Sequence, residues 1–212
     1  MEHGFWHAKW DSGQIGFHQD RPNAMLVEHF PRLAVAAGAS VFVPMCGKTR
    51  DIHWLLDHGY RVVGAELSEK AVRQLFDDLG QTPEATMVDG ALRLSGPRLT
   101  VHVGDIFALK AGDIGPVDAV FDRAALIALP DDMRLRYARH LGALSGHAPQ
   151  ILVTLTYDQD AMDGPPFSVT ADEVEQRYSD AYSIELLEQA EVSGGLKGRI
   201  PATQTAWLLS PK

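Results

Sequence analysis

Cysteine and long apolar runs are the features that the sequence has least of. Cysteine occurs once in 212 residues, at Cys46, so no disulfide can form within the chain and no metal site can use several thiolates. No apolar run approaches the roughly 20 residues of a membrane-spanning helix. The start of the chain carries tryptophan, histidine and charged groups where a signal peptide has an apolar stretch. We therefore expect a cytoplasmic chain with neither a membrane segment nor a metal ion.

Positive charge is scarce as well. Lysine and arginine number 19 against 28 aspartates and glutamates, which gives a formal net charge of -9 at pH 7. No cluster of basic residues offers a stripe that could follow a phosphate backbone. The charge therefore argues against a nucleic acid partner, and we expect a monomer whose ligands are small molecules.

Internal repeats and linker-like stretches are also missing, so residues 1–212 are expected to form one domain with an N-terminal extension. Strand-like apolar runs alternate with helical patterns along most of the chain. Strands are predicted over residues 40–44, 61–67, 99–103, 117–121, 150–156, 182–187 and 203–209. Helices are predicted over 24–37, 50–58, 69–79 and 131–144, and after Thr170, whose spacing to Glu173 fits a capping box. Residues 84–96 are ambiguous, with a hairpin as one interpretation.

This order of elements predicts an α/β fold, a Rossmann-like doubly wound sheet of seven mostly parallel strands with helices on both faces. Ligands of such folds bind at the carboxyl ends of the strands. The order alone leaves a dehydrogenase, a kinase and a methyltransferase open.

The turn after the first predicted strand separates these classes. Its sequence, PMCGKTRD, lacks the G-x-G-x-x-G of a dinucleotide site, and Phe42 stands where a phosphate-binding loop would begin with glycine. The single Gly47 would let the backbone approach a ligand without a pyrophosphate. A tight turn that needs glycine for its own conformation explains Gly47 equally well.

Glu66 ends the second predicted strand, 19 residues after Gly47. In doubly wound nucleotide-binding folds, an acid about 20 residues beyond the glycine turn accepts hydrogen bonds from ribose hydroxyls. An ionised carboxylate can accept from two vicinal hydroxyls at once. The spacing favours an adenosyl ligand, and a solvated acid at a strand end is the alternative.

Two further groups follow the third and fourth predicted strands. Asp105 could face an adenine amino group while Ile106 packs on the ring, although Gly-Asp is also a common turn. Arg123 would bring a permanent cation to the same edge, where it could pair with a cofactor carboxylate or an anionic substrate. A structural ion pair with Asp122 or another neighbour is the alternative for Arg123.

The N-terminal stretch FWHAKWDSGQIGFHQ is dense in aromatic residues. Trp6, Trp10 and Phe17 are spaced too irregularly for a simple amphipathic helix. Aromatic faces suit a sulfonium cation and a planar heterocycle. Residues 1–22 are therefore expected to cover the ligand site, and a hydrophobic strap over the core is the alternative.

Taken together, these stretches resemble the thiopurine S-methyltransferases. The matching stretches, in family order, are FWHAKWDSGQIGFHQ, VFVPMCGKTRDIHWLLDHGYRVVGAELSE, GDIF, DAVFDRAALIALP and LTYDQDAMDGPPFSV. The resemblance implies a class I methyltransferase that uses S-adenosylmethionine to methylate the sulfur of small aromatic or heterocyclic thiols. Bacterial members are also associated with selenium and tellurium compounds.

The resemblance also implies roles for individual residues. Positions that match cofactor contacts are Trp10, Met45, Glu66 and Arg123, with Asp105 and Ile106 on the adenine side and Trp6 in the same N-terminal motif. Positions that match the substrate pocket are Phe17 and Pro166, with Arg123 facing both ligands. Met45 replaces the usual leucine, which nearly conserves volume. The chain departs from the family in EVSGGLKGRIPATQTAW, where a substrate loop is expected, so the acceptor is less constrained than the cofactor.

The expected chemistry is an in-line displacement at the sulfonium methyl group. A thiol ionises readily, so no dedicated general base is required and no catalytic residue is assigned. His18 is the best alternative proton acceptor, whereas Cys46 is not expected to act as a nucleophile because direct transfer needs no covalent enzyme intermediate. A methyltransferase for halide, oxygen or nitrogen, and a non-catalytic cofactor-binding relative, are the competing hypotheses.

Overall fold

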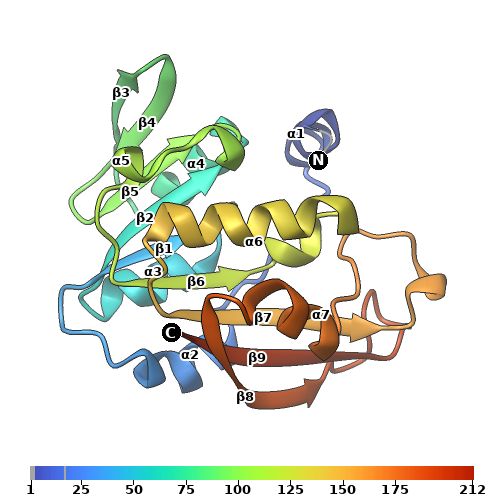
Figure 1. The fold of residues 1–212 in the computed structure, drawn as a ribbon. Coiled ribbons are helices and arrows are strands. Elements are labelled where there is room, and N and C mark those ends of the chain that lie inside the picture. Colours follow the sequence, from blue (N-terminus) through green and yellow to red (C-terminus); the bar gives the residue numbers. More distant parts are fainter. Residues whose placement is uncertain (1–2, 17) are drawn as a thin grey trace.

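A computed structural model describes residues 3–16 and 18–212, which form a single sheet flanked by helices (Figure 1). Its order is β3-β4-β5-β2-β1-β6-β7-β9-β8. The strands are β1 (Ser40–Val43), β2 (Arg61–Glu66), β3 (Glu84–Val88), β4 (Ala91–Ser95), β5 (Leu99–Val103), β6 (Ala119–Arg123), β7 (Gln150–Tyr157), β8 (Tyr182–Glu191) and β9 (Ala202–Pro211). The α-helices are α1 (His3–Asp11), α2 (Ala24–His29), α3 (Arg50–Asp57), α4 (Glu69–Asp78), α5 (Ala111–Ile114), α6 (Asp131–Ser145) and α7 (Ala171–Tyr178). Short 3-10 helices are η1 (Phe30–Leu33), η2 (Ile106–Ala108), η3 (Leu126–Ala128) and η4 (Gln159–Ala161).

The centre of the sheet, from β5 through β2, β1 and β6 to β7, is parallel, and both ends are antiparallel. The described residues form nine strands, so the prediction of seven was wrong in number. The additional pair is the β3–β4 hairpin, which turns at Asp89 and Gly90, both with positive φ. Residues of β3 lie at an open edge and are largely exposed, so burial did not impose a clear apolar pattern on them.

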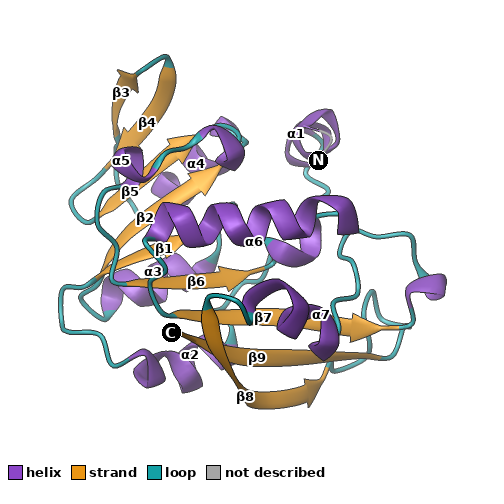
Figure 2. Cartoon of the chain, viewed as in Figure 1, coloured by secondary structure: helices purple, strands orange, loops and turns teal. Residues whose placement is uncertain are grey.

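Alternation along the strands divides the core in two. Val41 and Val43 of β1 face the layer of α2, α3 and α4, whereas Phe42 faces the layer of α5, α6 and α7. Successive side chains of a strand point to opposite faces, so a strand covered by helices on both sides is apolar throughout. Figure 2 shows the helices on the two faces and the loops that join them to the strands.

Side chains fix the starts of the site-bearing helices. Thr49 accepts a hydrogen bond from the backbone N–H of Asp51 at the start of α3, and Ser68 caps α4 in the same way. Thr170 accepts from Glu173 N–H, so the first bond of the predicted capping box is confirmed, whereas the Glu173 carboxylate pairs with Arg134 and Arg177. The predicted helix over 24–37 is shorter, because α2 passes into the 3-10 helix that contains Pro31.

Within residues 3–16 and 18–212, none of the helices is both long and apolar enough to span a bilayer.

Candidate functional site at the carboxyl edge of the sheet

The turn after β1 is held against the neighbouring strand β2. The backbone N–H of Cys46 donates to the carbonyl oxygen of Ala65 at 2.9 Å. Met45 and Gly47 on either side have φ of 47° and 51°, in the left-handed region. A non-glycine residue in that region is uncommon and costs free energy, so the backbone of Met45 is strained at this strand end.

Glu66, the last residue of β2, is buried beneath this turn. Its two carboxylate oxygens accept one backbone hydrogen bond each, from Gly47 N–H and from Ser68 N–H, both at 2.8 Å. Burial raises the pKa of the Glu66 carboxyl, and these backbone donors partly oppose the shift. Each oxygen has a second lone pair, so the carboxylate keeps capacity for two more donors.

Trp10 of α1 covers the same glycine. A β-carbon built on Gly47 would lie 3.0 Å from Cζ2 of Trp10, and the tryptophan side chain is buried. Trp10, Gly47 and Glu66 therefore form one contiguous cluster, although they come from three separate segments of the chain.

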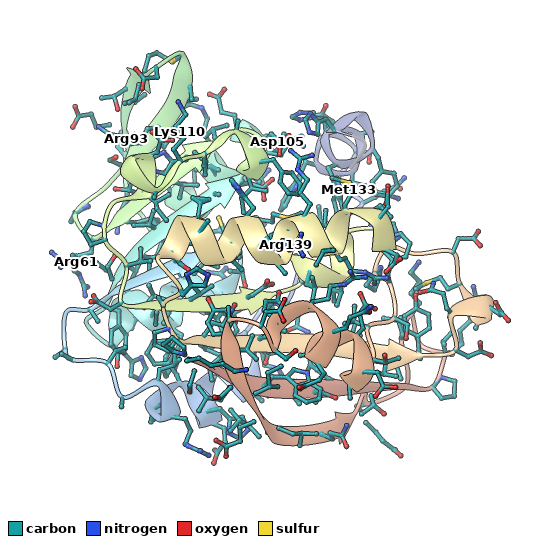
Figure 3. The ribbon with its side chains drawn as sticks, viewed as in Figure 1. Arg61, Arg93, Asp105, Lys110, Met133 and Arg139 are labelled. Carbon is teal, nitrogen blue, oxygen red and sulfur yellow. The ribbon has the colours of Figure 1, made fainter. Side chains whose placement is uncertain are left out.

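Contacts with the segment after β5 and with α4 join α1 to the rest of the fold. His3 Nε2 lies 3.3 Å from a carboxylate oxygen of Asp105, which follows β5, and Figure 3 shows Asp105 beside α1. Lys70 Nζ of α4 donates to the carbonyl oxygen of Asp11 at 3.1 Å. Asp105 also accepts from Phe107 N–H at 3.0 Å, and Ile106 between them is buried.

Arg123, the last residue of β6, pairs with a residue that the sequence did not single out. Its Nη1 donates to Oδ2 of Asp51, in the first turn of α3, at 3.4 Å. The alternative considered was a structural ion pair with Asp122 or another neighbour; such a pair exists, but its partner is Asp51 and not Asp122. Neighbouring strand residues face opposite ways, so Asp122 points into the layer of α6.

Asp122 is fully buried and accepts from the hydroxyl of Tyr137 at 2.7 Å. Burial raises its pKa to about 6, against the opposing effects of Tyr137 and of backbone N–H groups including that of Leu126. Ala124, two residues on, has a φ of 72°, which is strained for a residue with a β-carbon. Asp122 thus secures the turn that follows Arg123.

The loop that carries Pro166 is tied to the same part of the sheet. Tyr157 donates its hydroxyl hydrogen to the carbonyl oxygen of Pro166 at 2.6 Å. The next residue, Phe167, donates its N–H to the carbonyl oxygen of Ile127 at 2.7 Å. Since Ile127 belongs to the segment just after Arg123, the loop lies next to that strand end.

His18 and Cys46 differ in whether their side chains can take part in a reaction. Burial lowers the pKa of His18, and the nearby cations Lys48 and Arg50 lower it further. A neutral imidazole at pH 7 can accept a proton. The thiol of Cys46 is buried, and this burial together with the Glu66 carboxylate raises its pKa well above the usual value. A buried thiol of this kind is inert as a nucleophile.

The structure brings most of the predicted site residues to one edge. Those at or next to the carboxyl ends of the parallel strands are Met45, Glu66, Asp105, Ile106 and Arg123, with Trp10 over the first turn. Trp6 lies one helical turn before Trp10, partly buried, with its ring 5.2 Å from that of Phe5. Phe17 lies outside the described residues. The binding roles of all these residues stay predictions at this point.

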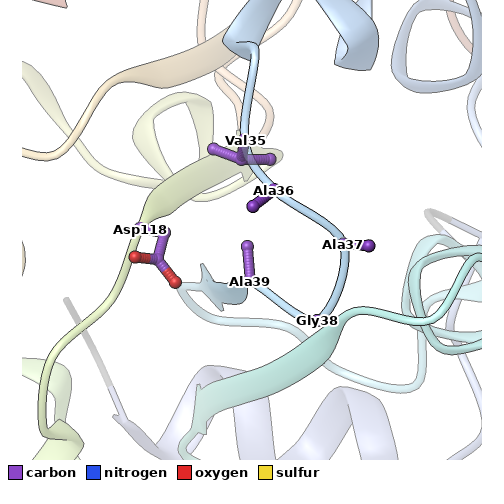
Figure 4. A pocket seen from close by; sticks show the side chains of 6 residues that line it. All are labelled: Val35, Ala36, Ala37, Gly38, Ala39 and Asp118. Carbon is purple, nitrogen blue, oxygen red and sulfur yellow. The ribbon is translucent and has the colours of Figure 1, made fainter.

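Two surface hollows lie outside this cluster. One is at the amino edge of the sheet, between the chain from Val35 to Ala39 and Asp118 (Figure 4). The carboxylate of Asp118 is occupied there by Ser40 N–H at 2.7 Å. The other hollow is lined by Thr156 of β7 and by residues such as Arg199 from the C-terminal region that departs from the family pattern.

Comparison with known proteins gives a full-length match. A family model described as "Thiopurine S-methyltransferase (TPMT)" matches residues 1–203. The thiopurine S-methyltransferase of Xanthobacter autotrophicus is 56% identical over 210 residues, which cover 99% of each chain. That of Gluconobacter oxydans is 45% identical over 207 residues, or 98% of this chain and 94% of the relative.

Solved structures agree on the fold. A SAM-dependent methyltransferase from Anabaena variabilis superposes with a TM-score of 0.66 at 15% identity, covering 99% of this chain and 95% of its own. The 1,6-didemethyltoxoflavin-N1-methyltransferase of Burkholderia thailandensis, with bound S-adenosylhomocysteine, gives 0.65 at 15% identity over 98% and 87%. The predicted class I methyltransferase fold is thereby confirmed. The chain belongs to the thiopurine S-methyltransferase family, whose members use S-adenosylmethionine as methyl donor.

Proposed function

We propose that the protein methylates the sulfur of small aromatic or heterocyclic thiols, with selenium and tellurium compounds as further acceptors. The acceptor class rests on the relatives named thiopurine S-methyltransferase, which match this chain at up to 56% identity over its whole length. The donor side rests on one geometric observation, the buried Glu66 carboxylate bonded to Gly47 N–H beneath Trp10.

The residues at the carboxyl edge fit this donor. Glu66 has two lone pairs left for the vicinal ribose hydroxyls, and the Gly47 backbone can approach the ligand closely. Asp105 and Ile106 would hold the adenine, and Arg123 would pair with the carboxylate of the methionine part. Met45 would line the same pocket. S-adenosylmethionine supplies a methyl group on a sulfonium, which is an excellent leaving group.

The N-terminal segment of residues 1–22 would close the site. α1 is joined to the segment after β5 through His3 and to α4 through Asp11, and Trp10 would offer an aromatic face to a cationic ligand. Trp6 would lie on the donor side with Trp10, and Phe17 and Pro166 would bound the acceptor. Such a cover excludes water and holds the reacting atoms at about 3–3.5 Å.

The acceptor needs little acid–base help. A thiol ionises near neutral pH, and the Arg123 guanidinium favours the anion electrostatically. His18 is the candidate proton acceptor for a less acidic thiol; its lowered pKa keeps it neutral near pH 7 but also makes it a weaker base. Direct transfer to the acceptor leaves no role for the buried Cys46.

The test is a product assay with the full chain. Purified protein and S-adenosylmethionine are incubated with aromatic thiols, with the matching phenols and anilines, and with halide, selenite and tellurite, and methylated products are identified by mass spectrometry. We expect thiol products at rates well above those for phenols and anilines. Methylation of oxygen, nitrogen or halide alone would reject the sulfur assignment, and no methylation of any acceptor would identify a non-catalytic relative.

A further inference from the structure

The carboxylate of Asp51, next to Arg123, accepts three hydrogen bonds. The residue is 1% exposed, and its two oxygens accept hydrogen bonds from three different parts of the fold. Oδ1 accepts from the backbone N–H of Asn23 at 2.7 Å. Oδ2 accepts from the hydroxyl of Thr49 at 2.8 Å and from Nη1 of Arg123 at 3.4 Å. Asp51 therefore joins the start of α2, the start of α3 and the end of β6.

Arg123 is only 13% exposed in its side chain and could otherwise adopt several rotamers. A guanidinium has five N–H donors in a rigid fork. The bond to Asp51 uses Nη1, so donors are left over for a ligand. An anchored fork loses less conformational entropy when it binds a carboxylate than a free one does.

We propose that Asp51 is a positioning residue, which orients the Arg123 guanidinium toward the carboxylate of the methyl donor. The proposal rests on the donor-site role assigned to Arg123 under the proposed function. Asp51 itself touches neither donor nor acceptor. It acts by holding the cation that does.

A carboxylate suits this position better than an amide. Three donors converge on two oxygens, and an asparagine has one oxygen and one NH2 group. In Asp51→Asn, either Asn23 N–H or the pair of Thr49 and Arg123 must face a donor. In the second orientation the guanidinium is released, and in the first it keeps only a neutral amide oxygen as acceptor; its volume and charge are unchanged in both.

The loss of Asp51 also has an opposite electrostatic effect. A buried anion next to Arg123 partly neutralises it, so its removal raises the positive potential at the site. Positioning predicts that Asp51→Asn weakens donor binding, whereas neutralisation predicts that it strengthens donor binding. The measured affinity therefore distinguishes the two effects. If positioning dominates, the donor binds more weakly in Asp51→Asn.

The experiment compares two ligands of the full-length protein by titration calorimetry. S-adenosylhomocysteine has the amino-acid carboxylate, and 5′-methylthioadenosine lacks it. The variants are Asp51→Asn, Arg123→Lys and the double variant, each first checked for cooperative unfolding. Asp118→Asn is the matched control, because Asp118 also accepts a backbone N–H but at the opposite edge of the sheet. Thr170→Ala is a second control, because it removes a side-chain helix cap of the same kind from α7 without touching the bonds of Asp51.

We expect Asp51→Asn and Arg123→Lys each to weaken S-adenosylhomocysteine about tenfold, and the double variant to be little worse than either, as for coupled residues. Binding of 5′-methylthioadenosine should change by less than about twofold, since its contacts avoid Arg123. Both controls should keep the wild-type ratio of the two affinities.

Three results would overturn the inference. Unchanged or tighter S-adenosylhomocysteine binding in Asp51→Asn would show that Asp51 does not position the cation. Equal weakening of both ligands would show a structural role only. Loss in Asp51→Asn with none in Arg123→Lys would remove Arg123 from the donor site. Activity on thiols is a separate measurement, so failure of the inference and failure of the proposed function remain distinguishable.

Discussion

The indole of Trp10 covers the α-carbon of Gly47 so closely that a β-carbon there would lie 3.0 Å from Cζ2 and 3.4 Å from Cη2. The N–H of the same glycine donates to Glu66. One residue thus joins the N-terminal helix to the acid at the end of β2. Both the side-chain size and the backbone conformation at position 47 matter for this arrangement.

Gly47→Ala tests this arrangement of Trp10, Gly47 and Glu66 directly. The new methyl group would push Trp10 away, and its φ of 51° would be strained by about 1–2 kcal/mol. We expect S-adenosylhomocysteine to bind about tenfold more weakly or worse, as one close contact and one positioned N–H are disturbed. Titration calorimetry measures the affinity, and chemical denaturation measures the stability.

Gly38→Ala is the matched control, because Gly38 has a φ of 80° but nothing within 4 Å of the new methyl group. It should lose stability to a similar extent and keep the affinity. If both variants lost affinity equally, the contact with Trp10 would have no part in binding.

Glu66→Gln probes the buried carboxylate. A glutamine must turn its NH2 group toward either Gly47 N–H or Ser68 N–H, so one backbone donor loses its acceptor. One of the two ribose bonds is lost as well. We expect S-adenosylhomocysteine affinity to fall about tenfold, in line with 1–3 kcal/mol for an unsatisfied buried donor.

The control for this prediction lies three residues along the chain. Glu69, at the exposed start of α4, forms an i,i+4 ion pair with Arg73, and Glu69→Gln should leave binding unchanged. Wild-type affinity in Glu66→Gln would remove the ribose role from Glu66.

The sequence predicted the parts of the site that depend on spacing along the chain. Gly47 and Glu66 were paired from their separation and from the place of each at a strand end, and the hydrogen bond between them is observed. Arg123 was placed at the same edge by the same reasoning. Their placement at one edge is observed because the carboxyl ends of parallel strands meet there, and their ligand roles stay predictions.

Other features depend on contacts between residues far apart in the chain, and they have no clear pattern in the sequence. α1 is a helix although its aromatic spacing argued against an amphipathic one, because it lies over the site and buries mainly Trp10. Asp51 lies in the first turn of the predicted helix over 50–58, where the helix dipole favours any acid, so its place in the sequence does not single it out. Its pairing with Arg123 spans 72 residues and has no local signature.

Gly64 and Cys46 give a prediction about packing. A β-carbon on Gly64 would lie 2.9 Å from Sγ of Cys46, inside contact distance. Gly64→Ala should therefore destabilise the protein by about 1–3 kcal/mol through overpacking. Adding Cys46→Ala removes the sulfur and should recover part of this loss, which denaturant titrations of the single and double variants can measure. If the losses of unfolding free energy in the two single variants simply add in the double variant, residue 64 does not press on the Cys46 sulfur.

Asp122 gives a prediction about pH. Its pKa is about 6 in the folded protein against an ordinary value of 3.8, because burial disfavours the charged form. Below the lower value both states hold the proton and no penalty exists. Between about pH 4 and pH 6 the unfolded chain ionises first, so the contribution of Asp122 to stability falls as pH rises, and the penalty is constant above. A shift of about two units corresponds to roughly 3 kcal/mol at most.

Asp122→Asn should remove this dependence while keeping an acceptor for the Tyr137 hydroxyl. Other groups also titrate in the window, among them Glu66, whose raised pKa adds the same sign. The quantity to compare is therefore the difference in unfolding free energy between wild type and Asp122→Asn, measured by denaturant titration at several pH values from 4 to 7. The difference should shift in favour of the variant as pH rises through the window and then level off. A difference that is flat with pH would mean that the Asp122 carboxyl titrates in the folded protein as it does in the unfolded chain, and that the Tyr137 and backbone donors offset its burial completely.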